Sequence, residues 1–168
     1  YRRSTLYRRV ERRMGIHRLN KISSYVRYLQ ENPQELDILF KELLIGVTRF
    51  FRDPPAWRIL AKDVLPKLLS GRPARSVVRA WVAGCSSGEE AYTLAMIFAE
   101  ALGEAKSTNG ISLQIYATDL DKDAIDKARL SLFPENIVAD VSPERLARFF
   151  VKEENGYRVN KQIRSMVV

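Results

Sequence analysis

The sequence predicts an α/β fold of the nucleotide-binding type, preceded by a small all-α domain. An apolar run at 77–83 ends in a turn of small residues at 84–88, and a helical pattern follows from Ala91. A second run, 111–117, alternates as a strand does and ends in Thr118-Asp119. Strand, glycine-containing turn and helix in this order are typical of the first unit of a nucleotide-type binding domain.

The first 45 residues predict a helical domain. In its first helix the apolar residues share one face and lie at Leu6, Tyr7, Val10 and Met14. A second helix is expected around 23–30, and Asn32-Pro33 is typical of the start of a third. Residues 46–74 are expected to form a linker and a connecting helix, which leaves 75–168 for the α/β domain.

The carboxyl-terminal part of the α/β domain continues with shorter elements. Asp121 is placed to cap a helix over 121–130, and Ser142-Pro143 is typical of the start of another. Asn155-Gly156 predicts a tight turn, and 164–168 has the pattern of a strand just beginning. Because a doubly wound sheet needs more than two or three strands to close its core, we expect this domain to be truncated at its carboxyl end.

Two acidic residues, Glu89 and Glu90, directly follow the glycine-containing turn. A phosphate seeks bare N–H groups at a helix start, and a carboxylate there repels it. A ligand with a cationic end fits better, and S-adenosylmethionine carries both an ammonium and a sulfonium. Asp119 lies at the end of the second strand, where such folds place an acid on ribose hydroxyls. It lies 31 residues after Gly88, against about 20 in dinucleotide-binding enzymes, which weakens the prediction of NAD without excluding it.

Four motifs occur together along the chain. They are TRFFR at 48–52, WVAGCSSGEEAY at 81–92, ATD at 117–119 and AR at 128–129. In this combination the chain resembles the CheR family, the S-adenosylmethionine-dependent methyltransferases that esterify glutamates on bacterial chemoreceptors. The resemblance covers essentially the whole chain, including the basic amino-terminal helix. It implies a fragment of a larger CheR-containing protein, with the later strands and the inserted β-subdomain of the family lying outside these residues.

The resemblance also implies a set of site residues for S-adenosylmethionine and its product, S-adenosylhomocysteine. The cofactor-binding positions are Thr48, Arg52, Gly84, Gly88, Glu90 and Asp119. Among them, Glu90 is expected to take the ammonium and Asp119 the ribose hydroxyls. Arg52 is the candidate catalytic residue, because a guanidinium can hold a carboxylate bidentately, either that of the cofactor or that of the incoming glutamate.

The net charge of +8 is concentrated at the amino terminus. Residues 1–21 hold eight basic residues against Glu11 alone, and the rest of the chain is nearly neutral. Such an asymmetry predicts a docking element. Its candidate residues lie opposite the apolar stripe of the first helix and are Arg8, Arg9, Arg12 and Arg13. By the resemblance, the partner is the glutamate-bearing cytoplasmic helical bundle of a chemoreceptor.

Composition argues against several other classes of protein. No apolar stretch approaches the roughly 18 residues needed to span a membrane, and the arginine-rich start is unlike a secretory signal, so no membrane insertion is expected. The single cysteine, Cys85, cannot form an internal disulfide and fits a reducing cytoplasm. The single histidine, His17, lies outside the motifs, and no metal site is expected.

Other interpretations stay open beside this one. Asp53-Pro54-Pro55 and the basic helix together suggest a nucleic-acid methyltransferase, but such enzymes stack the flipped base on an aromatic that follows the prolines, and Trp57 is one position late. A non-catalytic module that binds S-adenosylmethionine or docks on a receptor has the same fold and ligand. Glu89 and Glu90 can also serve only to complement the helix dipole.

Overall fold

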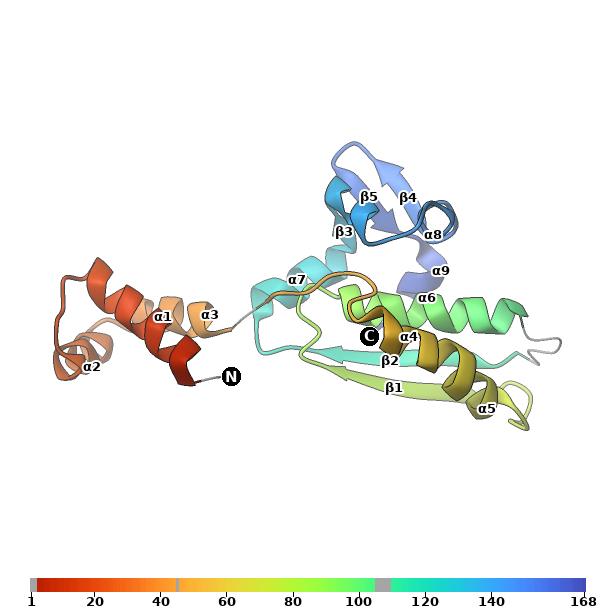
Figure 1. Cartoon of the computed structure of the whole chain (residues 1–168), viewed down its shortest axis with the longest axis horizontal. Coiled ribbons are helices and arrows are strands. Elements are labelled where there is room, and N and C mark those ends of the chain that lie inside the picture. The colour runs from red at the N-terminus through yellow and green to blue at the C-terminus, as the bar shows by residue number, and fades with distance from the viewer. Residues whose placement is uncertain (1–2, 45, 105–109) are drawn as a thin grey trace. The chain divides into compact units, whose positions relative to one another are not determined.

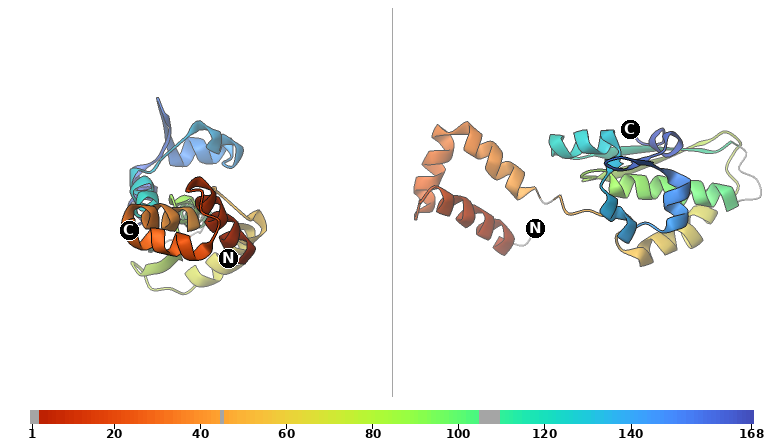
Figure 2. Two further views of the ribbon diagram at one scale, coloured as in Figure 1. Left: turned by 90° about the vertical axis from the view of Figure 1, so that its left-hand side faces the viewer. Right: turned by 90° about the horizontal axis from the view of Figure 1, so that it is seen from above.

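The computed structural model describes residues 3–44, 46–104 and 110–168 and divides into two compact units, 1–45 and 46–168 (Figure 1). Each unit is described by itself. The first consists of three successive helices, coloured red to orange in Figure 2, which are α1 (Arg3–Ile16), α2 (Ile22–Glu31) and α3 (Pro33–Leu43). Both α1 and α2 contact α3, so the third helix holds the unit together.

The interior of the first unit is partly polar. Tyr25 of α2 and Leu39 of α3 are buried, and with them Arg13 of α1 and Glu35 of α3. A three-helix unit of this size has little apolar surface to bury, so these charged side chains occupy space that a larger domain would fill with aliphatic residues. Arg13 and Glu35 form an ion pair, which is therefore part of the core of this unit.

The second unit opens with a helical rod of three consecutive segments: α4 (Pro54–Ile59), the π-helical turn η1 (Leu60–Val64) and α5 (Leu65–Leu69). Pro66 has no N–H to donate to the carbonyl four residues before it, and the wider turn ends at Val64, two residues before this proline. The chain then enters β1 (Val77–Ala83), α6 (Glu89–Glu104), β2 (Ser112–Thr118) and α7 (Lys122–Leu130).

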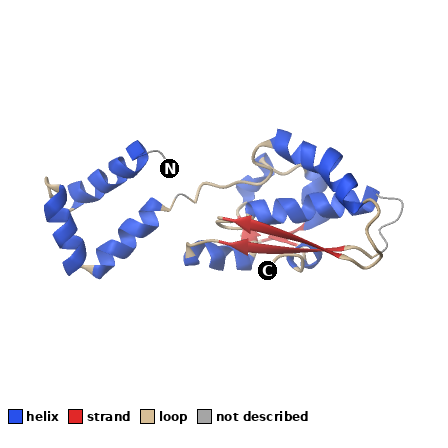
Figure 3. Ribbon diagram, turned by 90° about the horizontal axis from the view of Figure 1, so that it is seen from below, coloured by secondary structure: helices blue, strands red, loops and turns tan. Residues whose placement is uncertain are grey.

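The two strands β1 and β2 form a parallel pair, drawn as the long red arrows in Figure 3. Val77 pairs with Ser112 at one end and Ala83 with Thr118 at the other, so both strands finish at the same edge. The chain end adds to this sheet. Met166 O accepts a 2.7 Å bond from Ile115 N, and a parallel bridge joins Ile115 to Val167. Strand-like pairing thus begins two residues later than predicted, because Arg164 still belongs to α9 (Lys161–Arg164).

The sheet is covered on one of its faces. Val78, Val82, Leu113 and Ile115 are buried in the same cluster as the apolar side of α6. Alternate residues of the same strands point to the opposite face, and Trp81 there is 73% exposed. Within the described residues, α6 is the element that provides most of the core facing the sheet, through Ala95, Met96, Ile97 and Phe98.

A small antiparallel sheet follows α7, and its strands are β3 (Leu132–Phe133), β4 (Phe150–Glu153) and β5 (Gly156–Val159), in the order β3-β5-β4. The 3₁₀ helix η2 (Glu135–Ala139) and the helix α8 (Pro143–Phe149) connect β3 to β4 (Figure 1). The sequence analysis did not predict this sheet. Its short strands show little periodicity in the sequence, and only the turn predicted at Asn155-Gly156 indicated a hairpin.

Candidate functional site

The turn after β1 ties the ends of the two parallel strands together. The backbone N–H groups of Gly84 and Cys85 both donate to Thr118 O at the end of β2, at 2.7 and 3.0 Å. Gly84 has a φ of +72° and Gly88 one of +96°, a region that side chains with a Cβ rarely adopt. The turn can therefore follow this path because glycines stand at these two positions.

Close packing also leaves little room for a side chain at Gly88, directly before α6 begins. A Cβ at this position would lie 3.1 Å from the Cβ of Ala128 on α7 and 3.1 Å from the ring of Tyr92. The Tyr92 hydroxyl donates to Ala128 O at 2.8 Å. The start of α6 thus packs directly on α7, and a side chain at position 88 would disturb this contact.

Asp119 is held against the turn by both of its carboxylate oxygens. Oδ2 accepts from the N–H of Ser86 at 2.8 Å, and Oδ1 accepts from the N–H of Asp121 at 2.8 Å. A carboxylate oxygen can accept a further bond after each of these. The side chain is therefore fixed in place while it can still accept bonds from a pair of hydroxyls.

The two glutamates after the turn have different surroundings. Glu89 is half-buried and accepts from the hydroxyl of Ser87 at 3.0 and 2.8 Å. Burial raises the pKa of Glu89, and the Ser87 hydrogen bond opposes this shift. Glu90 is exposed in the first turn of α6, and among the described contacts none occupies its carboxylate. Of the two, Glu90 is thus the one free to meet a cationic ligand group.

The linker that carries Thr48 and Arg52 touches the turn and α6 at separate points. A Cβ at Gly46 would lie 3.2 Å from Ser86 Oγ, which puts the start of the linker beside the turn. Farther on, Phe51 N donates to Thr93 Oγ1 of α6 at 3.2 Å. Arg52 is exposed and donates to Val47 O at 3.0 Å. No described contact joins Thr48 or Arg52 to Glu90 or Asp119, so the linker reaches the site region without closing on it.

Three residues that hold the site together were given no role in the sequence analysis. Ser86 and Ser87 present an N–H and a hydroxyl to Asp119 and Glu89, and Thr93 is wholly buried while it binds the linker. Small polar residues in a glycine turn are the feature that could have pointed to the two serines. The contact of Thr93 joins residues 42 apart, which local patterns do not reveal.

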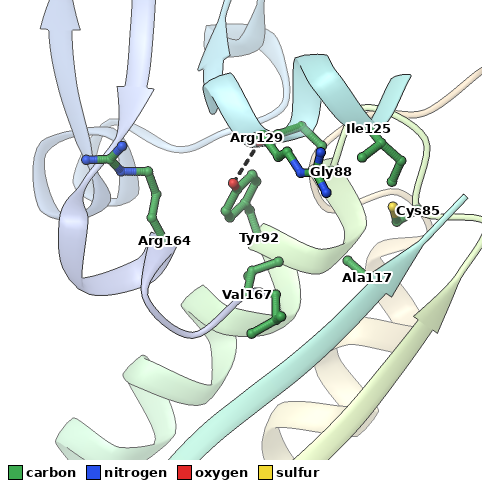
Figure 4. Close-up of a pocket in the computed structure, with 10 residues that line it drawn as sticks. Cys85, Gly88, Tyr92, Ala117, Ile125, Arg129, Arg164 and Val167 are labelled. Atoms are coloured by element: carbon green, nitrogen blue, oxygen red, sulfur yellow. Dashed lines mark hydrogen bonds between the residues drawn. The ribbon is translucent and has the colours of Figure 1, made fainter. Parts of the chain in front are cut away.

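A cavity of about 230 Å³ lies beside the turn, between α6, α7 and the carboxyl end of the chain (Figure 4). Its wall is mainly apolar, with Cys85, Ala117 and Ile125 on one side and Val167 near the sheet. Of the expected ligand residues, Gly88 alone lines this cavity. Burial raises the pKa of the Cys85 thiol, in keeping with a structural residue.

The basic face of α1 is only partly free. Arg13 is 9% exposed, and its Nε donates to Glu35 Oε1 at 2.8 Å. The expectation that all four arginines face a partner is wrong for Arg13, because Glu35 at the start of α3 draws its guanidinium into the unit. Arg12 is 65% exposed and pairs with Glu42 at 2.6 Å, and Arg9 donates to the carbonyl of Glu42. With Arg8, these two arginines border a basic hollow of about 430 Å³.

Comparison with known families covers nearly the whole chain. The family described as "CheR methyltransferase, SAM binding domain" matches residues 46–168, and that described as "CheR methyltransferase, all-alpha domain" matches residues 1–44. The chain belongs to the CheR methyltransferase family. Both parts of the predicted fold class, the all-α domain and the S-adenosylmethionine-binding α/β domain, are confirmed.

The CheR relatives differ greatly in length. The chain is 40% identical over 168 residues to the "Uncharacterized 104.1 kDa protein in hypE 3'region" of Rhodobacter capsulatus, covering all of this chain and 17% of that protein. It is 28% identical over 173 residues to the chemotaxis protein methyltransferase of Salmonella typhimurium, covering 99% of this chain and 56% of that protein. Chemotaxis protein methyltransferase 2 of Pseudomonas aeruginosa is 29% identical, with 96% and 56% covered. The chain thus spans about half of the named chemotaxis methyltransferases.

The residues of this CheR chain fit S-adenosylmethionine. Asp119 offers fixed acceptors for ribose hydroxyls, and Glu90 offers an exposed carboxylate for the ammonium. Open space lies where a Cβ of Gly84 would stand, so the backbone there can approach a ligand closely. Among the described residues, no group of three or more His, Cys, Asp or Glu side chains is arranged to hold a metal ion. Nor does any helix in this part of the chain have the length and apolar character to cross a membrane.

Proposed function

We propose that this chain is the docking and cofactor-binding part of a protein-glutamate O-methyltransferase that acts on chemoreceptors in the cytoplasm. The observation that carries the proposal is the attachment of Asp119 to Ser86 N–H, which brings the second-strand acid to the glycine turn. The relatives from Salmonella typhimurium and Pseudomonas aeruginosa are named chemotaxis protein methyltransferases, which supports methyl transfer in chemotaxis. The receptor glutamate as the methyl acceptor is part of the proposal.

The chemistry asks little of acid–base groups. S-adenosylmethionine supplies a methyl group activated by its sulfonium, and a glutamate with a pKa near 4.3 is already ionised at pH 7. A carboxylate oxygen forms the new bond to the methyl carbon as the bond from that carbon to sulfur breaks. The protein contributes alignment, which is worth about 7–11 kcal/mol in well-oriented reactions.

Each site residue binds a different polar or charged group of the cofactor or the substrate. Glu90 holds the ammonium of the cofactor, and Asp119 its ribose hydroxyls. Arg52 binds a carboxylate with its planar fork, after exchanging its present bond to Val47 O. A guanidinium beside the reacting glutamate keeps that carboxylate ionised and oriented.

The partner surface is the exposed part of the basic helix. Arg8 and Arg12 point to solvent on α1, and the hollow that they border can receive an acidic side chain. A glutamate-bearing helical bundle offers rows of such side chains. This docking role rests on charge, so it is expected to weaken with salt.

The decisive experiment uses the full-length protein, a receptor cytoplasmic segment and S-adenosylmethionine labelled in its methyl group. We expect base-labile methyl esters to form on receptor glutamates, and a receptor segment with its methylated glutamates changed to alanine serves as control. Label that survives base treatment, or that appears equally on the control segment, contradicts glutamate methylation.

A second candidate is a non-catalytic module within a larger signalling protein. The observation that favours it is the 104.1 kDa relative, of which this chain covers 17%. In that case the full-length protein binds S-adenosylhomocysteine and the receptor segment but forms no methyl esters. A nucleic-acid methyltransferase is less well supported, because Trp57 donates its indole N–H to Arg52 O at 2.6 Å and packs against the core, away from any stacking role.

A further inference from the structure

The ring of Phe51, next to Arg52 in the linker, lies under a guanidinium from a distant helix. Arg145 of α8 places its guanidinium carbon 4.1 Å from the centre of the Phe51 ring. The same guanidinium makes a two-pronged ion pair with Glu100 of α6, with Nε–Oε1 and Nη2–Oε2 distances of 2.8 Å each. Arg145 is therefore held by α6 while it covers a linker residue.

The linker needs such a hold because its backbone is unusual at this point. Phe51 has a φ of +50° and Asp53 one of +60°, so two residues with side chains adopt the left-handed region on either side of Arg52. Conformations of this kind persist only where the surroundings over-determine them, and they cluster at functional sites. Phe51 N also donates to the wholly buried Thr93 of α6.

The neighbouring Phe50 fixes the other side of the linker. It is 1% exposed, and its ring meets Phe133 and Phe150 edge to face at centroid distances of 4.8 and 5.4 Å. Phe50 thus anchors the linker in the small antiparallel sheet, and Phe51 anchors it to α6 and α8. Arg52 directly follows these two anchored residues, and its side chain is exposed to solvent.

We propose that Arg145, held by Glu100, is a positioning residue for Arg52. It touches no expected ligand position, and it acts by keeping Phe51 in the left-handed conformation from which Arg52 projects. The inference rests on the function proposed above, in which Arg52 binds a carboxylate at the site. It assigns α8 and the end of α6 a role in turnover that the cofactor-binding motif does not contain.

The first test is a double-mutant cycle in the full-length protein. Arg145→Met removes the charge and the stacking. We expect methyl-ester formation to fall about 10- to 100-fold, because a misplacement of about 1 Å caused from a distance can cost about 100-fold in rate. Because Arg145 acts through Arg52, the same change in an Arg52→Ala background should have almost no further effect. A loss of equal size in both backgrounds overturns the proposal.

A matched control lies on the same helix. Arg148 also covers a phenylalanine, Phe149, at 4.9 Å, but that ring belongs to α8 itself. Arg148→Met should leave turnover within about twofold of wild type, since surface substitutions away from special features have small effects. Arg145→Lys keeps the charge and loses the fork, so turnover should fall between wild type and Arg145→Met.

The second test measures the conformation of the linker by NMR and needs no activity assay. Trp57 donates its indole N–H to Arg52 O at 2.6 Å, and Trp81 donates its own to Thr118 Oγ1 at 3.0 Å. In the ¹H–¹⁵N spectrum of the full-length protein, Arg145→Met should shift or broaden the indole signal of Trp57 and leave that of Trp81 in place. If neither signal moves, or both move together, Arg145 does not position the linker.

These outcomes separate the inference from the proposed function. Wild-type protein that forms no methyl esters contradicts the function, while the Trp57 signal still reports whether Arg145 holds the linker. Wild-type protein that does form esters, combined with Arg145→Met at wild-type turnover, contradicts the inference alone.

Discussion

Arg13 of α1 and Glu35 of α3 form a buried ion pair, with Nε of the arginine 2.8 Å from Oε1 of the glutamate. The carboxylate of Glu35 gathers further partners. The hydroxyl of Tyr25 on α2 donates to Oε1 at 2.8 Å, and His17 Nε2 lies 2.8 Å from Oε2. One acidic side chain thus connects all three helices of the first unit, and its arginine partner comes from the helix that carries the proposed docking residues.

The ion pair predicts a stability difference between neighbouring arginines. Arg13→Met leaves the buried Glu35 charge without its main partner, and breaking a buried pair in this way costs about 3–5 kcal/mol. Arg12→Met removes an exposed pair with Glu42, and such pairs are worth about 0–1 kcal/mol. Urea unfolding followed at the assigned amide signals of α1–α3 in the full-length protein measures both. Equal losses for the two variants contradict a structural role specific to Arg13.

The same pair predicts acid sensitivity of the first unit. The hydrogen bonds from Arg13 are the main cause that lowers the pKa of Glu35 to about 2 from its ordinary value of 4.5. The stability that this shift contributes is fully present above pH 4.5 and is lost as the pH falls through about 2. We expect the urea midpoint of the α1–α3 signals to drop between pH 4.5 and 2. In Glu35→Gln this drop should be smaller, and a drop of equal size assigns the acid sensitivity to other carboxylates.

Burial raises the pKa of Tyr25 to about 12, with its bond to Glu35 as a further cause. Its proton is therefore retained over the whole acid range. The hydroxyl that Tyr25 donates to Glu35 therefore keeps its proton between pH 4.5 and 2, while the Glu35 carboxylate becomes protonated in this range.

Local patterns predicted the elements that depend on local chemistry. The alternation at 111–117 and the apolar run at 77–83 gave two strands, and the caps at Asp121 and Ser142 started helices where the structure has them. The position of Asp119 beside the turn also followed from the sequence, since parallel strands end at a common edge of the sheet.

Contacts between distant segments were beyond those patterns. The helical pattern of the first helix put Arg13 on the same face as the other arginines, although Glu35, 22 residues away, draws it inside. Phe51 and Asp53 adopt left-handed conformations, which the sequence did not predict because neither residue is a glycine. The short strands of the antiparallel sheet have too few residues for periodicity, and pairing with distant partners decides them.

The ribose assignment predicts a change in cofactor affinity. Asp119→Ala removes acceptors for two hydroxyls and leaves Ser86 N–H without its partner, so binding of S-adenosylhomocysteine to the full-length protein should weaken by about 1.5–3 kcal/mol. Calorimetric titration measures this affinity. Asp126→Asn serves as a control, because Asp126 pairs with exposed Lys122 and Arg129 on the surface of α7. Unchanged affinity in Asp119→Ala removes the ribose role.

The docking proposal predicts which arginines matter to the receptor. Arg8 and Arg12 are exposed on α1, whereas Arg13 is committed to Glu35, so the docking effect should appear with Arg8→Glu and Arg12→Glu combined. We expect the KM for the receptor segment to rise at least tenfold at low salt, with affinity for S-adenosylhomocysteine unchanged. Arg27→Glu on α2 is the matched control, since it reverses an exposed arginine outside the basic hollow.

Ionic strength provides the internal check on this docking interaction. Exposed charges interact over about 10 Å at 0.1 M salt and less at higher salt, so the wild-type KM should rise with salt toward that of the doubly reversed variant. Glu42 pairs with Arg12 and accepts from Arg9, and it therefore competes with an acidic partner for the same guanidinium groups. Glu42→Gln should accordingly lower the KM for the receptor segment. A KM that responds to neither salt nor Glu42→Gln means that this face of α1 is solvated and that the receptor binds elsewhere.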